Sequence, residues 1–296
     1  AGEMSEQSVA IGIRGLKMNA PWLKVKTYEN VAGWVYSVGL YPKDTDTDSK
    51  WIRDVDDIRT KSFFGENIYE MAKNYQRQWQ AAQTSQDLSV LFSAAEKIQE
   101  AMNNVLSDKL EVEDPMTLPD MTWIERSVPG LHTSLVAEGT QFHLFKNYKK
   151  MHTKAKTTEG KEDDNFFELQ FAVNEVDSIE HFYKSWFLQT WDYGGSSLLG
   201  QGKHLAILNR INEQLSASKI FAPYIMAIKS ELLKDISEEY VTYWESKEKI
   251  LDELRNILQK DFVFLTKADR VMLKTRMKMF ENPIANKIEV NQRGGG

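Results

Sequence analysis

The sequence predicts a mainly α protein, a helical bundle with one long C-terminal helix, that also contains a small antiparallel β portion. Apolar residues recur every three or four positions over residues 50–109, 203–215 and 223–260, which is the spacing of a helix with one buried face. β-branched and aromatic residues are concentrated in residues 8–41 and 132–176, as is typical of strands. An α+β description fits the same pattern.

The β-rich N-terminal segment contains three strand-like stretches. Val9, Ile11 and Ile13 alternate with small or polar residues, which is the pattern of a half-buried strand. Residues 22–26 and 33–41 combine β-branched and aromatic side chains, so we expect strands there as well.

Three helices are predicted between about residues 50 and 109. A polar loop, residues 43–50, precedes them, and the period of the apolar residues then changes from two to between three and four. The apolar stripe is interrupted at Gly65 and again at Thr84 and Ser85, which are residue types that favour helix boundaries.

A proline-rich connector is predicted after these helices. Pro115, Pro119 and Pro129 lie within residues 111–131. Because proline lacks a backbone N–H and has a fixed φ, long regular structure is not expected across this stretch.

A β-hairpin is predicted over residues 132–176. Its arms are expected to be Thr133–Tyr148 and Phe166–Val176, because side chains of opposite polarity alternate in the second of these stretches. Residues 149–165, between the arms, carry many charges and almost no apolar side chains. We therefore expect this charged excursion to be mobile.

Helices are predicted for most of the remaining chain. A first helix is expected over residues 178–192 and a second over residues 203–215, separated by a glycine-rich loop. Thr266 and Asp269 have the spacing of a capping box, which predicts a last helix that ends before an Asn-Pro pair.

The long helix is predicted to run from about Pro223 to Lys260, because an apolar stripe continues through the whole range. At 1.5 Å per residue it would be roughly 55 Å long, longer than a domain of this size is wide. We expect one end to project, with Tyr243, Trp244 and Leu251 forming an exposed apolar patch for a partner.

Composition limits the possible functions. The 296 residues include 37 Lys and Arg, 43 Asp and Glu, and no Cys, for a formal charge of −6. The lack of Cys excludes disulfide frameworks, Cys-ligated zinc and thiol catalysis, and the mild acidity argues against bulk nucleic-acid binding. We predict no cofactor and no transmembrane segment, and the compartment stays open. We expect one integrated domain, or at most two, built from segments 1–42, 43–110, 111–131, 132–176 and 177–296.

One acidic loop is a candidate metal site. Asp44, Asp46 and Asp48 occupy positions 1, 3 and 5 of a calcium-loop pattern. Position 6 is Ser49 where the pattern needs Gly, and position 12 is Val55 where it needs Glu. We therefore favour a solvated acidic loop that places negative charge at the start of a helix.

A glycine-rich stretch, residues 194–204, has some features of a phosphate-binding loop. Gly202 and Lys203 match that pattern, but its first position is Ser197 and the hydroxyl position after the lysine is His204. An ordinary loop between helices is the favoured interpretation, although an anion could bind the N–H groups at the start of the next helix.

Aromatic side chains provide the candidate interaction residues. Tyr183, Trp186, Trp191 and Tyr193 are crowded into one window of the sequence, and their helical spacing makes most of them core. Trp and Tyr are also the residues that contribute most to binding at interfaces. The complete set of candidates is Tyr183, Trp186, Trp191, Tyr193, Tyr243 and Trp244.

The sequence contains no recognisable catalytic motif, and three functions are considered. We favour a non-catalytic structural or binding protein that is a component of a larger protein assembly and contacts protein partners or further copies of itself. The alternative is an enzyme whose site is built from scattered polar residues, with catalytic residues that cannot be named from sequence. A secreted, membrane-active helical protein is the second alternative.

Overall fold

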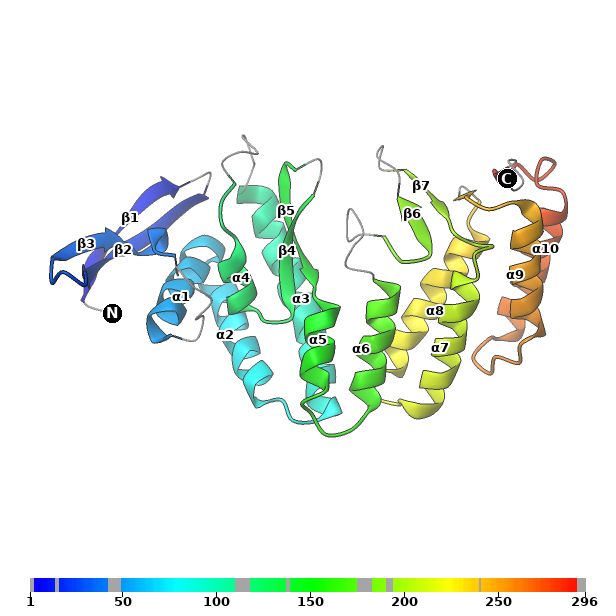
Figure 1. Cartoon of the computed structure of the whole chain (residues 1–296), viewed down its shortest axis with the longest axis horizontal. Helices are drawn as coiled ribbons and strands as arrows, with labels where there is room; N and C mark the ends of the chain where they lie inside the picture. The colour runs from blue at the N-terminus through cyan, green and yellow to red at the C-terminus, as the bar shows by residue number, and fades with distance from the viewer. Residues whose placement is uncertain are drawn as a thin grey trace. The chain divides into compact units, whose positions relative to one another are not determined.

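The computed structural model confirms a mainly α fold with small sheets. It describes residues 3–13, 16–41, 49–109, 118–136, 139–174, 183–189, 194–239 and 241–291. The chain divides into two compact units, residues 1–150 and 151–296 (Figure 1).

The first unit begins with a three-stranded antiparallel sheet in the order β1-β2-β3, which confirms the predicted β-rich segment. One face of the central strand is apolar: Leu16, Met18 and Ala20 alternate with exposed residues and are buried. The strands are β1 (Met4–Ile13), β2 (Leu16–Lys26) and β3 (Ala32–Tyr36).

The three predicted helices are present and their breaks lie where expected. Gly65 separates the first two and has a φ of 87°, a left-handed conformation that glycine adopts without strain. Ser85 begins the third helix, whose first turn is capped by Asp87 through the N–H groups of Gln83 and Thr84. The helices are α1 (Lys50–Phe64), α2 (Glu66–Ala81) and α3 (Ser85–Lys109).

The predicted proline-rich connector contains one short helix in its described part. Residues 110–117 lie outside the described part, but helix α4 (Thr122–Ser127) follows them. Trp123 and Ile124 are fully buried there, and Trp123 packs against two aromatic rings of α1. This part of the stretch is therefore core of the first unit.

The predicted hairpin has a different second arm. Strand β4 (Leu131–Val136) pairs with β5 (Gln141–Lys146), and helix α5 (Tyr148–Ala155) and helix α6 (Glu162–Val173) then follow. The prediction of a strand over residues 166–176 is thus wrong in its described part, residues 166–174.

The burial pattern gives the physical reason for this correction. In α6 the buried residues Phe166, Leu169, Gln170 and Val173 recur at three and four positions, so a helix buries more apolar surface than a strand would. Residues 149–165 are also not an excursion between two strands, because α5 and the start of α6 occupy most of this range.

The described part of the second unit combines four further helices with a small three-stranded sheet. Strands β6 and β7 are antiparallel, whereas β7 and β8 are parallel. The elements are β6 (Phe187–Gln189), β7 (Gly195–Ser197), α7 (Lys203–Ala217), α8 (Ala222–Ser237), β8 (Thr242–Tyr243), α9 (Lys247–Gln259) and α10 (Lys267–Glu281). The helix predicted over residues 178–192 is wrong in its described part, where β6 lies.

The predicted long helix is also wrong, because it is two helices, α8 and α9, with β8 between them. The guanidinium of Arg276 donates to the carbonyl oxygens of Ile236 (2.9 Å) and Glu238 (2.8 Å) at the end of α8. These bonds satisfy carbonyl groups that would otherwise accept from the next helical turn. Glu238, which follows α8, has an extended backbone, and Tyr243 is buried in β8.

The last helix, α10, begins with the predicted capping box. The hydroxyl of Thr266 accepts from the N–H of Asp269, and the Asp269 carboxylate accepts from the N–H of Thr266 (2.8 Å). Among the described residues, no helix is both long enough and apolar enough to cross a membrane.

A buried ionic network joins α1 to its neighbours in the first unit. The Asp56 carboxylate accepts from Arg59 (3.0 Å) and from Nε of Arg126 (2.6 Å) on α4. Arg59 is 1% exposed, and its guanidinium also donates to the carbonyl oxygens of Val38 (3.1 Å) and Leu40. The segment that leads from β3 to α1 is therefore attached to α1 by one buried side chain.

We expect the substitution Asp56→Ala to lower the free energy of unfolding by about 3–5 kcal/mol, because Arg59 would stay buried without its charge partner. The control, Asp54→Ala on the same helix, removes only a solvent-exposed pair with Lys50 and should change stability by less than about 1 kcal/mol. Urea unfolding of both variants measures the difference. Equal losses would contradict the role given to Asp56.

Candidate interaction site

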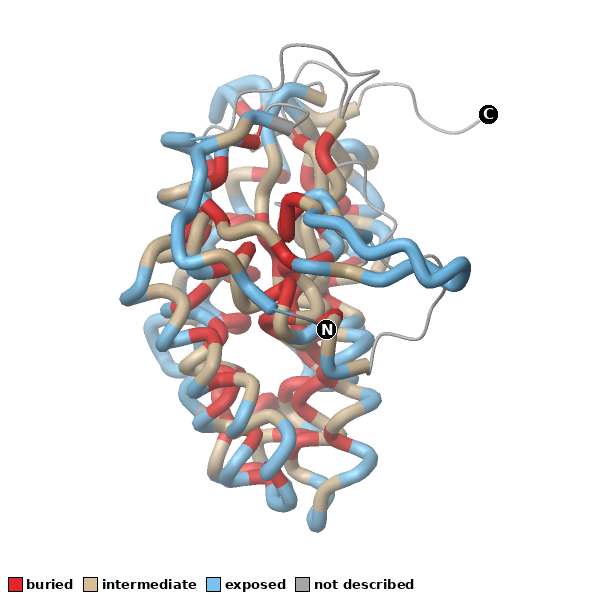
Figure 2. Tube along the Cα trace, turned by 90° about the vertical axis from the view of Figure 1, so that its left-hand side faces the viewer, coloured by how far each residue is buried: buried red, intermediate tan, exposed pale blue. Residues whose placement is uncertain are grey.

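An exposed β-hairpin is the most unusual surface feature of the first unit. We define the arm as residues 24–35, the outer part of β2, the turn and most of β3. Residues 26–34 are all exposed, and Figure 2 shows them as part of a continuous pale-blue stretch. Tyr28 is fully exposed, Val31 is 61% exposed and Trp34 is 46% exposed. The arm thus presents apolar side chains to solvent. Because these side chains stay in water, they contribute no hydrophobic free energy to the stability of the fold.

The arm also has an unprotected strand edge. Among the described residues, β1 and β3 are the two edge strands of their sheet, so each has one row of unpaired backbone groups. Residues 30–41, which include β3, contain no charged residue and no proline. Natural edge strands usually carry Lys, Pro or a bulge to prevent pairing with another chain, and β3 lacks the first two.

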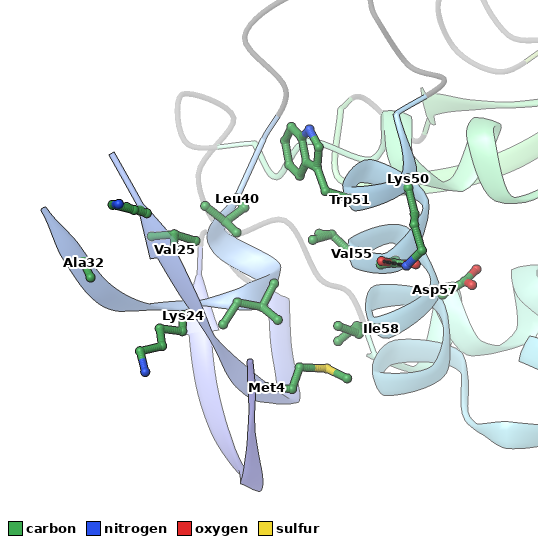
Figure 3. Close-up of a pocket in the computed structure, with 13 residues that line it drawn as sticks. Met4, Lys24, Val25, Ala32, Leu40, Lys50, Trp51, Val55, Asp57 and Ile58 are labelled. Atoms are coloured by element: carbon green, nitrogen blue, oxygen red, sulfur yellow. Dashed lines mark hydrogen bonds and ion pairs between the residues drawn. The ribbon is translucent and has the colours of Figure 1, made fainter. Parts of the chain in front are cut away.

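An apolar groove lies between the sheet and α1, at the inner side of the arm. Its volume is about 840 Å³, within the range of sites that hold a ligand or a few partner side chains. Figure 3 shows apolar side chains from both walls pointing into it. The principal apolar residues are Met4, Leu23, Leu40, Trp51, Val55 and Ile58.

The charges around the groove are mostly paired within the first unit. Lys24 forms an ion pair with Glu3 (3.0 Å), and Lys50 forms one with Asp54 (2.7 Å). Lys26 also lines the groove, and in the described part of the chain it has no ion-pair partner. Among the described residues, the groove therefore combines an apolar interior with a rim on which one lysine has no ion-pair partner.

Of the four suggested aromatic residues that the structure describes, three are buried or half-buried. Trp186 is 3% exposed and packs near His204, and Tyr243 is also buried. Tyr183 is half-buried and stacks on Phe187 with ring centroids 5.0 Å apart. Trp191 and Tyr193 lie outside the described residues.

Trp244 is the one described member of that set that is exposed, at 46%. It follows β8 and does not lie on a projecting helix, while Leu251, its expected neighbour in an exposed patch, is buried. The predicted patch at the end of a long helix is therefore wrong. The arm residues Tyr28 and Trp34 were not among the candidates, although the uncharged stretch around Trp34 is visible in the sequence.

The anion site considered at the start of α7 is occupied by a side chain of the protein itself. The Glu253 carboxylate accepts from the N–H groups of Gly200 (2.5 Å), Gly202 (2.9 Å) and Leu205 (2.9 Å). Lys203, which a phosphate loop would direct at its ligand, donates to the Ser185 carbonyl oxygen instead. A phosphate would have to displace a buried carboxylate, so the geometry disfavours this function.

A buried cluster of Ser197, Asp235 and His204 has the residue types of a hydrolase triad but not its geometry. The Ser197 hydroxyl donates to Oδ2 of Asp235 (2.6 Å), and Nε2 of His204 lies 2.8 Å from the same oxygen. In a triad the histidine stands between the serine and the carboxylate, whereas here the carboxylate stands between the other two. Ser197 and His204 are also fully buried, so no substrate reaches them.

Metal binding and known families add no further candidates. Among the described residues no group of three or more His, Asp or Glu side chains is arranged to hold a metal, and Asp44, Asp46 and Asp48 lie outside that part of the chain. Searches with family models, curated proteins and solved structures found no match to this chain.

We expect Glu253→Gln to lower the free energy of unfolding by about 1–3 kcal/mol, because an amide NH₂ group would face backbone N–H donors that a carboxylate now satisfies. The matched control is Asp252→Asn, which changes an exposed carboxylate one residue away that pairs only with Arg255 on the surface. Thermal melts of the two variants compare the effects. A larger loss in the control would contradict the capping role of Glu253.

Proposed function

We propose that this protein is a non-catalytic building block of a protein assembly and that copies contact one another through the arm. The observation that carries the proposal is the exposed hairpin itself, in which residues 26–34 form consecutive exposed positions with Tyr28, Val31 and Trp34 among them. Soluble proteins usually cover an exposed apolar group of this kind with a partner.

Energetics support a contact at this position. An isolated two-stranded hairpin is only marginally stable in water, and the outer part of the arm gains little stability from the rest of its own unit. A partner that covered Tyr28 and Trp34 would remove apolar surface from water, and pairing at β3 would satisfy its free backbone groups.

The edge of β3 supports a protein partner over a small molecule. Edge pairing requires another extended backbone, and its hydrogen bonds run along the whole strand. The uncharged residues 30–41 place no like-charge repulsion in the way of a second copy of the same segment. A free strand edge and an uncharged strand are both properties that favour pairing between copies of the same chain.

We expect the full chain to form dimers or larger species at micromolar concentration. Trp34→Glu should weaken self-association at least about tenfold, because it places a charge where an apolar side chain would be buried. Sedimentation velocity over a range of concentrations measures this effect, and thermal melts of the variant should be nearly unchanged because Trp34 is exposed.

The matched control is Val263→Glu, which introduces the same charge at an exposed apolar residue of the second unit (84% exposed). It should leave self-association unchanged. A wild-type chain that stays monomeric at every concentration, or equal effects of the two substitutions, would contradict a role for the arm in assembly.

A further inference from the structure

We propose that the groove between the sheet and α1 receives the tip of the arm from a second copy of this chain. We define the tip as residues 27–31, the turn that joins β2 to β3. The inference rests on the proposed function, because it names the partner and the receiving surface of the same site. It adds a specific contact, arm into groove, to the general proposal of self-association.

The two surfaces match in chemistry. The tip exposes Tyr28 and Val31, and the middle of β3 exposes Trp34. The groove interior is formed by apolar side chains such as Trp51 and Ile58. Aromatic and aliphatic side chains that enter an apolar pocket are the usual anchors of a protein interface.

The charges are complementary as well. The groove is lined by three lysines and two aspartates, a formal charge of 3 − 2 = +1, and Lys26 has no ion-pair partner in the described part of the chain. The tip carries one charged residue, Glu29, which is exposed. Docking would therefore bring a single carboxylate to a rim with a single excess cation, and burial of unpaired charge is avoided.

The arm of the same copy is too constrained to fill this groove. Val25 and Ala32 form part of the groove wall, and Lys26 pairs with Ala32 directly below the tip. Five residues cannot fold back onto a wall made by their immediate neighbours while that pairing persists. The occupant must therefore come from another molecule.

The contact closes into a pair when each copy places its tip in the groove of the other. Each arm would form one wall of its own groove and would also fill the groove of the partner. Both copies would therefore contribute the same two features, arm and groove, to the contact. Such an isologous contact is related by a twofold axis and stops at a dimer, which further contacts can then build into a larger assembly.

Cross-linking gives a direct test, because the chain contains no cysteine and any thiol introduced is the single one present. Val31→Cys places a thiol at the tip, and Lys50→Cys places one at the exposed rim of the groove. We expect a mixture of the two full-length variants, treated with a short bismaleimide, to give a heterodimer that mass spectrometry identifies by a cross-link between positions 31 and 50. The matched control replaces the tip variant with Val263→Cys, which is exposed on the second unit and should give at least about tenfold less product.

A mixing experiment gives a second readout that does not depend on cross-linking. Tyr28→Glu damages the tip and Trp51→Glu damages the groove, so each variant alone should lose most of its dimer in sedimentation velocity. Mixed together, they retain one undamaged tip and one undamaged groove, and heterodimer should reappear. Simple pairing of β3 edges predicts no such recovery.

The outcomes separate the two proposals. Dimers that form without a cross-link between positions 31 and 50 and without recovery on mixing would overturn arm-into-groove docking while leaving self-association in place. A chain that remains monomeric in sedimentation velocity would overturn both. The cross-link together with recovery would support the inference, and thermal melts confirm that each variant is folded.

Discussion

The arrangement of the first unit depends on the buried ion pair between Asp56 and Arg59. Arg59 is almost completely buried, and its guanidinium binds the carbonyl oxygens of Val38, in the 3-10 helix Ser37–Gly39 that follows β3, and of Leu40, which comes directly after it. A guanidinium at this depth is stable only with a carboxylate beside it, and Asp56 provides one. Arg126 adds a second cation from α4 to the same carboxylate, so α1, α4 and the residues that follow β3 are held by one network.

The second unit uses the same physical device. Arg276 of α10 binds the carbonyl groups at the end of α8 and also lies 3.0 Å from the Tyr243 hydroxyl oxygen, to which it donates. Burial raises the pKa of the Tyr243 hydroxyl, which stays protonated at neutral pH and donates in turn to the backbone at Asp235 and Ile236. In both units, ionised side chains from distant helices satisfy backbone groups where regular structure ends.

This dependence on distant residues explains which elements could be predicted from the sequence. The three helices α1 to α3 and the capping box of Thr266 and Asp269 depend on spacing within a few residues, and both predictions are confirmed. The end of α8 depends on Arg276, which lies 40 residues beyond its bonding partner Ile236. Because Ile236, Tyr243 and Ile250 are buried at intervals of seven residues, two helical turns, the apolar stripe continued through the break.

The candidate site was not predictable for a related reason. The sequence shows that positions 28 and 34 are aromatic, but it does not show which aromatic side chains are buried in the folded core. Trp123, on a proline-rich stretch, is fully buried, whereas Trp34, on a strand-like stretch, is exposed. An uncharged edge strand is the local signal that remains, and its meaning depends on whether another strand covers it.

The fixed root of the arm strengthens the argument for a binding role. The Tyr36 hydroxyl donates to the Met18 carbonyl oxygen (2.6 Å), the Tyr36 ring contacts Trp22 at 5.7 Å between centroids, and Arg59 holds the chain immediately after β3. The arm is therefore exposed at its tip but anchored at its base. A surface held in place before it binds loses less conformational entropy on association than a flexible one. The buried network that holds the residues after β3 on α1 would thus also fix the arm and the groove in place for the proposed partner.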